Sequence, residues 1–382
     1  MKKTYHITVC VLSLSLVGCG GGGGGGGGDT GITADTTAPA LLSQSPAGRL
    51  LKTDTAISIH FDESIDTASF TLGGSLAAES GGGVWSQTDV IDDTLTITPT
   101  TNWSVDTGRS LVINLKDLAG NPMAELTLGH DVYSGTLYYV SSAATDDSGD
   151  GLTPATAKQT IMAAITDAAP PATVVVNAGD YLVSNTPTDT RVQLMEGVSL
   201  YGGYSTDFSE RTPGSSVITD QSTLVADQNN PNFAVLGNEG ITSATLVDGF
   251  TLQGSIQTGP EYTSAIRMRF SAAPVVQNNT IHGGSGGVAT YSMYNNASSP
   301  LVQYNTIHGG NGSNTSGMWN RDSTPLVQHN TIHGGNGSNS SSGMLNTASS
   351  PLVQHNTIHG AMVTILMACV TMAPPPCAEQ HN

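Results

Sequence analysis

Histidine is the residue type whose spacing in this chain first suggests chemistry. His282, His308, His333 and His359 follow one another at intervals of 26, 25 and 26 residues. If a repeating fold placed them one above another, neighbouring imidazoles could share Zn²⁺ or Cu²⁺. The alternative is that a copied segment has copied its histidines too, as a polar ladder on the surface. We favour the ladder, because copying alone accounts for the spacing.

Carboxylates are too few in the same region to build the pair that glycoside hydrolysis requires. Between residues 271 and 360 the only acidic residue is Asp322, and the only basic residue is Arg321. Upstream, four residues could take part in acid–base chemistry but form no recognisable motif: Asp248, Glu261, Arg267 and Arg269. The sequence therefore predicts no catalytic residues, and we expect the chain not to be an enzyme.

One short segment resembles the opening of a calcium-binding loop. Asp146 and Asp150 flank Ser148, and a glycine follows at Gly151. An EF-hand loop would need a glutamate where this chain has Ala157, so that interpretation fails. A looser Ca²⁺ site at Asp146 and Asp150 stays open as a hypothesis beside the default, a plain Asp/Gly turn. No other cofactor is predicted.

The histidines belong to a segment, 272–360, in which one sequence motif occurs four times. Its prolines fall at positions 274, 300, 325 and 351, and each copy continues with Val, Asn and Ile at fixed offsets. A period of this length is typical of a solenoid in which each repeat forms one coil. The segment is rich in Asn, Ser, Thr, Gly and β-branched residues, which favour short strands separated by turns over helices.

In-register stacking of the coils would turn each repeated position into a column. Asn279, Asn305, Asn330 and Asn356 are expected at a turn, where stacked amides can bond to one another and to the turn backbone. Three apolar columns are expected in the interior: Val276, Val302, Val327 and Val353; Ile281, Ile307, Ile332 and Ile358; and Met293, Met318 and Met344. Each added coil would therefore extend the hydrophobic core.

The pattern Pro-x-Val-x-x-Asn-x-Ile resembles the right-handed parallel β-helix repeat of the pectate-lyase-like superfamily. The resemblance implies the fold for residues 136–360, with clear repeats at 272–360. It implies little about function, because that fold carries lyases, hydrolases, adhesins and inert stalks.

A second domain is expected before the solenoid, at residues 37–135. Alternating runs such as 56–61 and 110–115 predict about seven short strands, which fit a two-sheet sandwich. The segments 61–66 and 116–123 resemble the bacterial Ig-like domain of S-layer and other surface proteins. Asp62, Glu63 and Asp66 could hold Ca²⁺, but we interpret them as a solvated acidic loop.

A single helix is predicted, over residues 155–169. Ile161, Met162 and Ile165 give it an apolar stripe, and two prolines stop it. Its surroundings resemble the N-terminal cap of many pectate-lyase-like proteins, in which an amphipathic helix closes the open end of the coil stack. The predicted fold class is therefore all-β: an Ig-like sandwich followed by a right-handed parallel β-helix with an N-terminal capping helix.

The first residues predict export and lipid anchoring. Residues 1–18 have the charge and apolar run of a secretory signal peptide, and the sequence Leu16-Val-Gly-Cys19 resembles a lipobox. Cys19 would then be lipidated, and residues 19–36, with nine consecutive glycines, would form a flexible tether. The absence of Asp after Cys19 favours the outer membrane, so we expect a lipoprotein displayed at the cell surface.

Charge and cysteine content narrow the possible partners. The formal net charge of −18 does not favour nucleic acid or anionic lipid as a partner. Of the four cysteines, Cys10 leaves with the signal, Cys19 is lipidated, and Cys369 and Cys377 lie in an anomalous tail. The domains are therefore expected to fold without disulfides. The expected partners are the membrane, through the lipid, and an extracellular glycan or surface protein.

The tail, 361–382, breaks abruptly with the composition of the repeats. Yet Gln380-His-Asn382 follows Gln354-His-Asn356 by 26 residues, in step with the period. We predict that 361–378 is a repeat read in a shifted frame, and that the chain is a truncated form of a longer solenoid.

These features together predict a non-enzymatic surface protein for binding or adhesion, with carbohydrate as the expected ligand of its polar face. Two alternatives remain open. One is a polysaccharide lyase or glycoside hydrolase with its site in 180–270 or in a missing C-terminal part. The other is a purely structural stalk.

Overall fold

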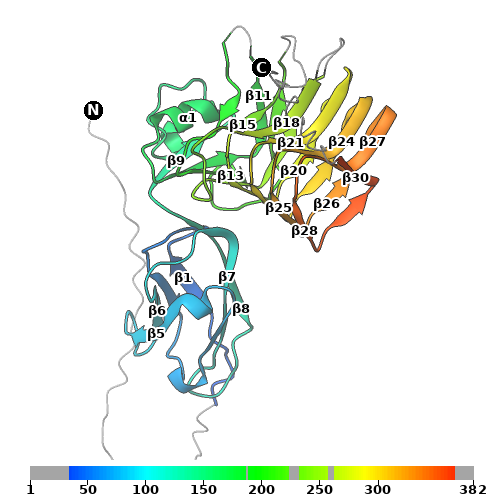
Figure 1. Ribbon diagram of the computed structural model, residues 1–382. Coiled ribbons are helices and arrows are strands. Elements are labelled where there is room, and N and C mark those ends of the chain that lie inside the picture. The colour runs from blue at the N-terminus through cyan, green and yellow to red at the C-terminus, as the bar shows by residue number, and fades with distance from the viewer. Residues whose placement is uncertain (1–33, 186–187, 223–231, 257–261, 366–382) are drawn as a thin grey trace, which may run out of the picture.

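The computed structural model describes residues 34–185, 188–222, 232–256 and 262–365. Within these ranges the chain is almost entirely β-structure: a sandwich of two sheets, followed by a stack of coils built from parallel strands (Figure 1). The predicted fold class is therefore confirmed. The signal segment, Cys19, most of the glycine tether and the tail beyond residue 365 lie outside the described residues.

The sandwich consists of two four-stranded sheets whose inner faces share one core. Alternation within a strand separates the faces: in Ile57–Phe61 the first, third and fifth side chains are buried. Trp103 fills the core and donates its indole N–H to the carbonyl of Thr55 over 2.8 Å. One sheet has the order β1 (Leu41–Ser45), β3 (Ile57–Phe61), β6 (Thr94–Pro99), β5 (Ser80–Ser86), and the other β2 (Leu50–Lys52), β8 (Leu126–Tyr133), β7 (Asp106–Asn114), β4 (Thr71–Gly73).

The coil stack has three parallel sheets, which we call sheets I, II and III. Sheet I contains β9 (Thr136–Val140), β10 (Ala172–Asn177), β13 (Val198–Tyr204), β16 (Leu246–Asp248), β19 (Val275–Gln277), β22 (Leu301–Gln303), β25 (Leu326–Gln328) and β28 (Leu352–Gln354). Sheet II contains β11 (Gly179–Val183), β14 (Ser216–Asp220), β17 (Phe250–Gln253), β20 (Thr280–His282), β23 (Thr306–His308), β26 (Thr331–His333) and β29 (Thr357–His359). Sheet III contains β12 (Val192–Gln193), β15 (Val235–Gly237), β18 (Tyr262–Arg269), β21 (Ala289–Asn296), β24 (Asn311–Arg321), β27 (Asn336–Thr347) and β30 (Ala361–Ile365).

The coils pair in the register that the period predicts. Val276 lies opposite Val302, and Ile281 lies opposite Ile307. The expected Val, Ile and Met columns form one continuous core, with Val353 and Ile358 partly buried in the last described coil. Each fully buried side chain of this type contributes about 1.5–3 kcal/mol relative to exposure, so every coil stabilises its neighbours.

The Asn column occupies the turn between sheets I and II. The backbone N–H and the Nδ2 of Asn305 both donate to Oδ1 of Asn330, over 2.9 and 3.0 Å, and Asn305 Nδ2 also reaches the carbonyl of Val276. The residue before each Asn, such as Tyr304, adopts a positive φ near 56°. A single residue in this conformation turns the chain sharply, and the amide column satisfies the polar groups that the turn would otherwise bury unpaired.

The predicted helix is shorter than expected: α1 spans Ile161–Asp167, not 155–169. The residues just before it are not α-helical. The backbone of Lys158 pairs with that of Tyr139 in an extended segment, and Thr160 caps the helix by accepting a hydrogen bond from the N–H of Ala163. The helix buries Ile161 and Ile165 against the first coils, at the end of the stack where β9 lies (Figure 1). No helix among the described residues is long and apolar enough to cross a membrane.

The first testable consequence concerns the Asn column. Asn330→Ala removes an amide that bonds to Val302, Gln328 and Asn356 and leaves those turn groups unsatisfied. Leaving buried polar groups unpaired costs about 1–3 kcal/mol, so the free energy of unfolding should fall by that amount in urea titrations. Asn336→Ala is the control, because Asn336 bonds to Asn311 at an exposed position. Equal stability of the two variants would contradict the assigned role of the column.

Candidate functional site

A buried network of charges joins the sandwich to the coil stack. Arg211, which follows β13, reaches Asp248 of β16 with Nη2 (2.5 Å to Oδ1) and Asp131 of β8 with Nη1 (3.5 Å to Oδ1). Tyr204 donates its hydroxyl to Asp131 over 3.0 Å, and Arg49 donates its Nε to the same carboxylate over 3.2 Å. The side chains of Arg211, Asp131 and Asp248 are 3%, 0% and 0% exposed, so the charges of this network are buried at the domain junction.

The surroundings of Asp131 and Arg211 favour the charged forms of both side chains. Burial by itself would raise the pKa of Asp131, but the charge of Arg211, the N–H of Gly108 and the charge of Arg49 together bring that pKa below its ordinary value. Burial would lower the pKa of Arg211, but Asp248, Tyr204 and Asp131 raise it instead. A carboxylate held ionised in this way is a poor general acid, so we assign the network to domain docking rather than to proton transfer.

Both carboxylate oxygens of Asp248 accept hydrogen bonds, Oδ1 from Nη2 of Arg211 and Oδ2 from three other donors. Besides Arg211, its Oδ2 accepts from Thr107 Oγ1 (2.9 Å), Gln277 Nε2 (2.8 Å) and Asn278 Nδ2 (2.7 Å). Thr107 belongs to the sandwich, so this carboxylate also bonds across the junction. Sequence reasoning named Asp248 as an isolated acid and could not detect its partners.

Beside the network, a cleft opens between the two domains, which we call the corner cleft. It consists of two adjoining cavities of about 570 and 430 Å³, both lined by Asp106 of the sandwich and by Gln277 and Gln303 of sheet I. The larger also contains Arg49 and Tyr304. Figure 1 shows the sandwich below the coil stack, with the strands of sheet I following one another along the stack from β13 to β25 and β28.

The outer face of sheet I carries three columns that run out of the corner cleft. The first is apolar, the second consists of glutamines, and the third consists of ring side chains in the sharp turn. These columns are Val275, Leu301, Leu326 and Leu352; Gln277, Gln303, Gln328 and Gln354; and Tyr304, His329 and His355.

The glutamines form a directional chain of hydrogen bonds. Nε2 of Gln328 donates to Oε1 of Gln303 (2.8 Å), and Nε2 of Gln303 donates to Oε1 of Gln277 (2.7 Å). Gln277 ends the chain by donating to Asp248 and to Asp106 of the sandwich, each over 2.8 Å. A primary amide has two N–H donors and two acceptor lone pairs, so each glutamine in the middle of the chain retains hydrogen-bonding capacity for a ligand.

The ring column lies alongside the glutamines. The rings of Tyr304 and His329 stack with centroids 5.1 Å apart, and those of His329 and His355 stack at 4.9 Å, both within 8° of parallel. Tyr304 is 54% exposed, and Leu352 in the apolar column is 57% exposed. The face therefore offers apolar surface next to a regular array of amides, a combination that suits a ligand with both C–H faces and hydroxyl groups.

The four histidines spaced by one repeat form a separate column on sheet II. The rings of His282, His308, His333 and His359 stack at 5.0, 4.8 and 4.4 Å and lie within 10° of parallel. Parallel stacked rings direct their nitrogen lone pairs in parallel, not toward one point between two coils. The geometry thus supports the polar ladder that we favoured over a column of shared metal ions.

The candidate calcium ligands do not converge. Oδ1 of Asp146 accepts from the N–H of Ser148, and Oδ1 of Asp150 accepts from the N–H of Leu152, so each carboxylate closes its own turn. The described residues instead bring ligand atoms together in two groups of the sandwich. One contains Asp35, Glu63 and Asp117, and the other contains His60, Asp89 and Asp93.

The scattered acids and bases of 180–270 do not assemble either. Asp248 lies on sheet I, Arg267 and Arg269 lie on β18 of sheet III, and Glu261 is outside the described residues. Sequence reasoning missed Asp220, at the end of β14, where burial raises the pKa of the carboxyl group to about 6. A perturbed carboxyl of this kind is a candidate acid. Within the described ranges, however, no hydrogen bond or ion pair links it to a second carboxyl group.

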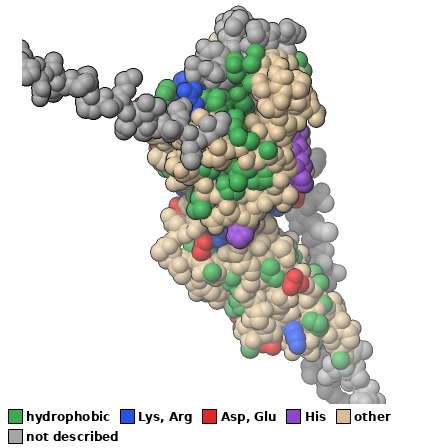
Figure 2. Space-filling model, turned by 45° about the vertical axis from the view of Figure 1, so that its right-hand side comes forward, with side chains coloured by type: hydrophobic (Ala, Val, Ile, Leu, Met, Phe, Trp, Pro, Cys, Tyr) green, Lys and Arg blue, Asp and Glu red, His purple; other side chains and the backbone are tan. Residues whose placement is uncertain are grey.

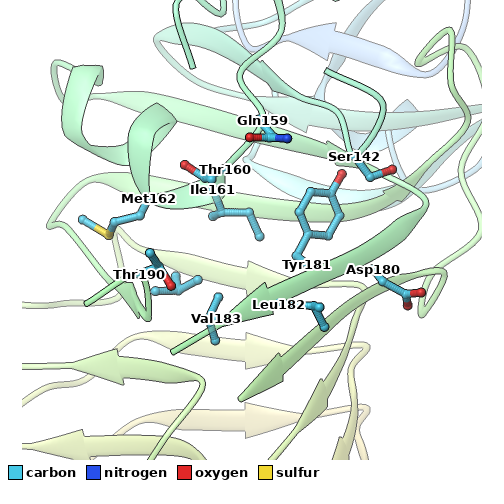
Figure 3. Close-up of a pocket in the computed structure, with 11 residues that line it drawn as sticks. Ser142, Gln159, Thr160, Ile161, Met162, Asp180, Tyr181, Leu182, Val183 and Thr190 are labelled. Atoms are coloured by element: carbon cyan, nitrogen blue, oxygen red, sulfur yellow. The ribbon is translucent and has the colours of Figure 1, made fainter. Parts of the chain in front are cut away.

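A third cavity, of about 280 Å³, lies under the capping helix (Figure 3). Ile161 and Met162 of the helix and Tyr181 and Val183 of β11 line it; Ile161 lies on the side of Tyr181, Met162 extends away from Tyr181, and Asp180 is exposed. Burial raises the pKa of Tyr181, which donates its hydroxyl to the carbonyl of Asn177. We interpret this cavity as a packing gap between helix and coils, since its walls present no pair of reactive groups.

Comparison with known families agrees with this architecture. Residues 35–136 match the bacterial Ig-like domain, and residues 214–370 match the right-handed β-helix region. No curated protein matches the chain significantly.

Two solved structures show distant similarity. One is a rhamnogalacturonan lyase, with 12% identity and a TM-score of 0.31, matched over 58% of this chain and 62% of the lyase. The other is an LD transpeptidase in complex with imipenem, with 16% identity and a TM-score of 0.18, matched over 28% of this chain and 45% of that one. The chain thus spans less than two thirds of each, and neither similarity bears on its function.

The domain junction yields a stability prediction. Arg211→Met leaves Asp131 and Asp248 buried without their cation, which typically costs about 3–5 kcal/mol. Lys52→Met, which removes an exposed ion pair with Asp54, should change stability by less than about 1 kcal/mol. Denaturant unfolding of both variants measures the difference. A loss no greater in Arg211→Met than in the control would show that the network does not hold the junction.

The sheet II histidines predict a pH dependence. Burial lowers the pKa of His282, and burial together with the charges of His282 and His333 lowers that of His308. The unfolded chain then binds protons more readily, so stability is complete above the unfolded pKa of about 6.5 and falls as the pH drops below it. Unfolding free energies at neutral and mildly acidic pH should show this loss, and a His282→Gln, His308→Gln variant should show less of it. An identical pH profile in the variant would contradict the assignment.

Proposed function

We propose that this chain, a bacterial Ig-like domain joined to a right-handed β-helix, is a non-enzymatic surface protein that binds carbohydrate. The binding surface is the outer face of sheet I together with the corner cleft. The signal segment 1–18, Cys19 and the glycine-rich tether support display at the outer membrane as a lipoprotein. Adhesion to a glycan outside the cell would follow from this placement.

The observation that carries the proposal is the arrangement of three columns on one open face. Sugar rings present C–H faces that pack on aromatic and aliphatic side chains, and hydroxyl groups that exchange hydrogen bonds with amides. Leu301, Gln303 and Tyr304 supply all three kinds of contact within one coil, and the next coils repeat the set about 4.8 Å further on. A repeating surface of this kind favours an extended polymer over a small molecule.

The state of the nearby carboxylates favours binding over cleavage. Asp131 and Asp248 are occupied by arginines and by amide or hydroxyl donors. Oδ1 of Asp106 accepts from the N–H of Thr107 and from Gln277, each over 2.8 Å. Hydrolysis needs one carboxyl group free to donate a proton and a second placed across the sugar, and the cleft offers no such pair among the described residues.

An enzyme remains the second candidate, because Asp220 has a pKa suited to acid–base chemistry. A polysaccharide lyase or glycoside hydrolase would release unsaturated or reducing ends, whereas a binding protein would not. Asp220→Asn is the informative variant: it should abolish turnover if Asp220 acts as an acid, and it should leave binding at sheet I unchanged.

A glycan array with the full-length chain separates a binding protein from a structural stalk. Retention of a defined set of glycans supports the proposal. The absence of binding to every glycan, from protein shown by circular dichroism to be folded and β-rich, would leave the stalk as the better description.

Tyr304 gives the sharpest mutational prediction. Tyr304→Ala removes an exposed ring from the mouth of the corner cleft, and the dissociation constant for a retained glycan should rise about tenfold, or roughly 1–2 kcal/mol. The control is Leu182→Ala, which removes a 60% exposed side chain from sheet II and should leave affinity unchanged. Isothermal titration calorimetry measures both. Equal affinities would place the glycan elsewhere.

A further inference from the structure

The second half of the solenoid carries almost no fixed charge. From residue 271 to residue 365 the only side chains with a permanent charge are Arg321 and Asp322, which pair with each other at 3.7 Å. The same span contains six histidines: His282, His308, His329, His333, His355 and His359. Histidine is the residue type in this span whose charge changes near neutral pH, so imidazole protonation would set the net charge of this part of the solenoid.

Four of these histidines form the straight column on sheet II. Figure 2 shows histidine side chains as a continuous strip on one flank of the stack. Beside the column lies a shallow groove of about 540 Å³, lined by His308, His333 and His359, by Asn311, Asn336 and Ser341, and by glycines of the adjoining turns. Those glycines add no side chains, which leaves the imidazole edges accessible to a chain lying along the stack.

The groups that face the column carry no charge. On sheet II itself the neighbouring outward column is threonine, as at Thr306 and Thr331, and Gln253 precedes His282 in the register. From sheet III the groove receives Asn311, Asn336 and Ser341. The turn toward sheet I holds the phenol of Tyr304 and the imidazoles of His329 and His355. The described part of the solenoid thus places no carboxylate against these histidines.

We propose that the His282–His359 column is a proton-dependent contact surface for an anionic polysaccharide, which it binds in mild acid and releases at neutral pH. This surface lies on sheet II, so the proposal goes beyond binding at sheet I and does not depend on it.

Repulsion within the column links the proton to the polyanion. Two unit charges about 4 Å apart repel by about 1 kcal/mol even in bulk water, and each imidazolium here would have a like-charged neighbour within 5.0 Å. Burial and this repulsion lower the pKa of His308 in the free protein. A bound polyanion replaces repulsion by attraction, so binding must raise proton affinity and protonation must strengthen binding by the same factor.

The spacing of the column favours one type of polyanion. The rings repeat every 4.4–5.0 Å, which is close to the length of one sugar unit in an extended polysaccharide. A polymer with one carboxylate or sulfate per sugar can therefore place one negative charge beside each coil. The formal charge of −18 on the whole chain opposes binding away from this column and sharpens the dependence on histidine protonation.

The test uses heparin as the probe and the full-length chain at about pH 5 and about pH 7.5, in low salt. The wild-type chain should bind at the lower pH and weaken at least about tenfold at the higher pH, within the usual range of coupled equilibria. A His308→Asn, His333→Asn variant should lose this difference. The matched control is Thr306→Asn, Thr331→Asn, which makes the same number of substitutions in the neighbouring outward column of sheet II, removes no imidazole and should retain it.

A gain-of-function variant shows whether lost binding in the other variants could be due to misfolding, because a misfolded protein would not gain binding. His308→Lys with His333→Lys keeps two positive charges at neutral pH and should bind heparin at about pH 7.5 more tightly than the wild-type chain does. Binding that does not change with pH, equal loss in both Asn variants, or no gain from the lysines would overturn the proposal. A glycan array with neutral glycans, repeated at both pH values, measures binding at the proposed sheet I site separately. Failure of one proposal can thus be distinguished from failure of the other.

Discussion

The structure depends on one constraint: each coil must hydrogen-bond in register to the coil before it. The threonine after each turn asparagine donates its N–H to the asparagine carbonyl one coil back, as Thr306 does to Asn279 and Thr331 to Asn305, each over 2.9 Å. Consecutive coils share one register, so equivalent residues of successive repeats lie directly above one another. A residue type at a repeated position must therefore pack against a residue of the same type in the next coil. Stacking thus converts a linear repeat into columns of identical side chains.

The columns explain why the candidate surfaces of this protein are arrays. Inside, Val, Ile and Met fill the core; at the turn, asparagines pair with one another; outside, glutamines and rings remain for a ligand. The junction between the coil stack and the sandwich does not follow the repeat, and its contacts occur once. There Arg211 is fixed between two carboxylates, and the glutamine chain ends on Asp248 and Asp106. The docking network therefore also sets where the proposed binding face begins.

Features that follow from the repeat period and from local residue patterns could be predicted from the sequence. The Val, Ile and Met columns lie in the core because their spacing equals one coil, and the Asn column lies at a turn because Asn tolerates and satisfies that backbone. The predicted bounds of the helix were wrong. The residues before Ile161 are compatible with a helix by composition, but hydrogen bonds of Lys158 and Thr160 to distant residues keep them out of the α-helix. A second buried amide column, Asn295, Asn320 and Asn346, was missed because sheet III is less regular in sequence.

The corner cleft could not be predicted at all. Arg211 lies 80 residues from Asp131 and 37 from Asp248, and no periodicity connects the sandwich with the coils. Gln277 and Gln303 were visible in the repeat, but only the docked sandwich shows that their column runs into a cleft.

The most direct test of the central claim is to incubate the purified full-length chain with a panel of polysaccharides, with and without Ca²⁺. Retention of the polymer and release of reducing or unsaturated ends are then measured on the same samples. We expect retention of at least one polysaccharide without release of product. Product release that is lost in Asp220→Asn would contradict it and would identify the chain as an enzyme.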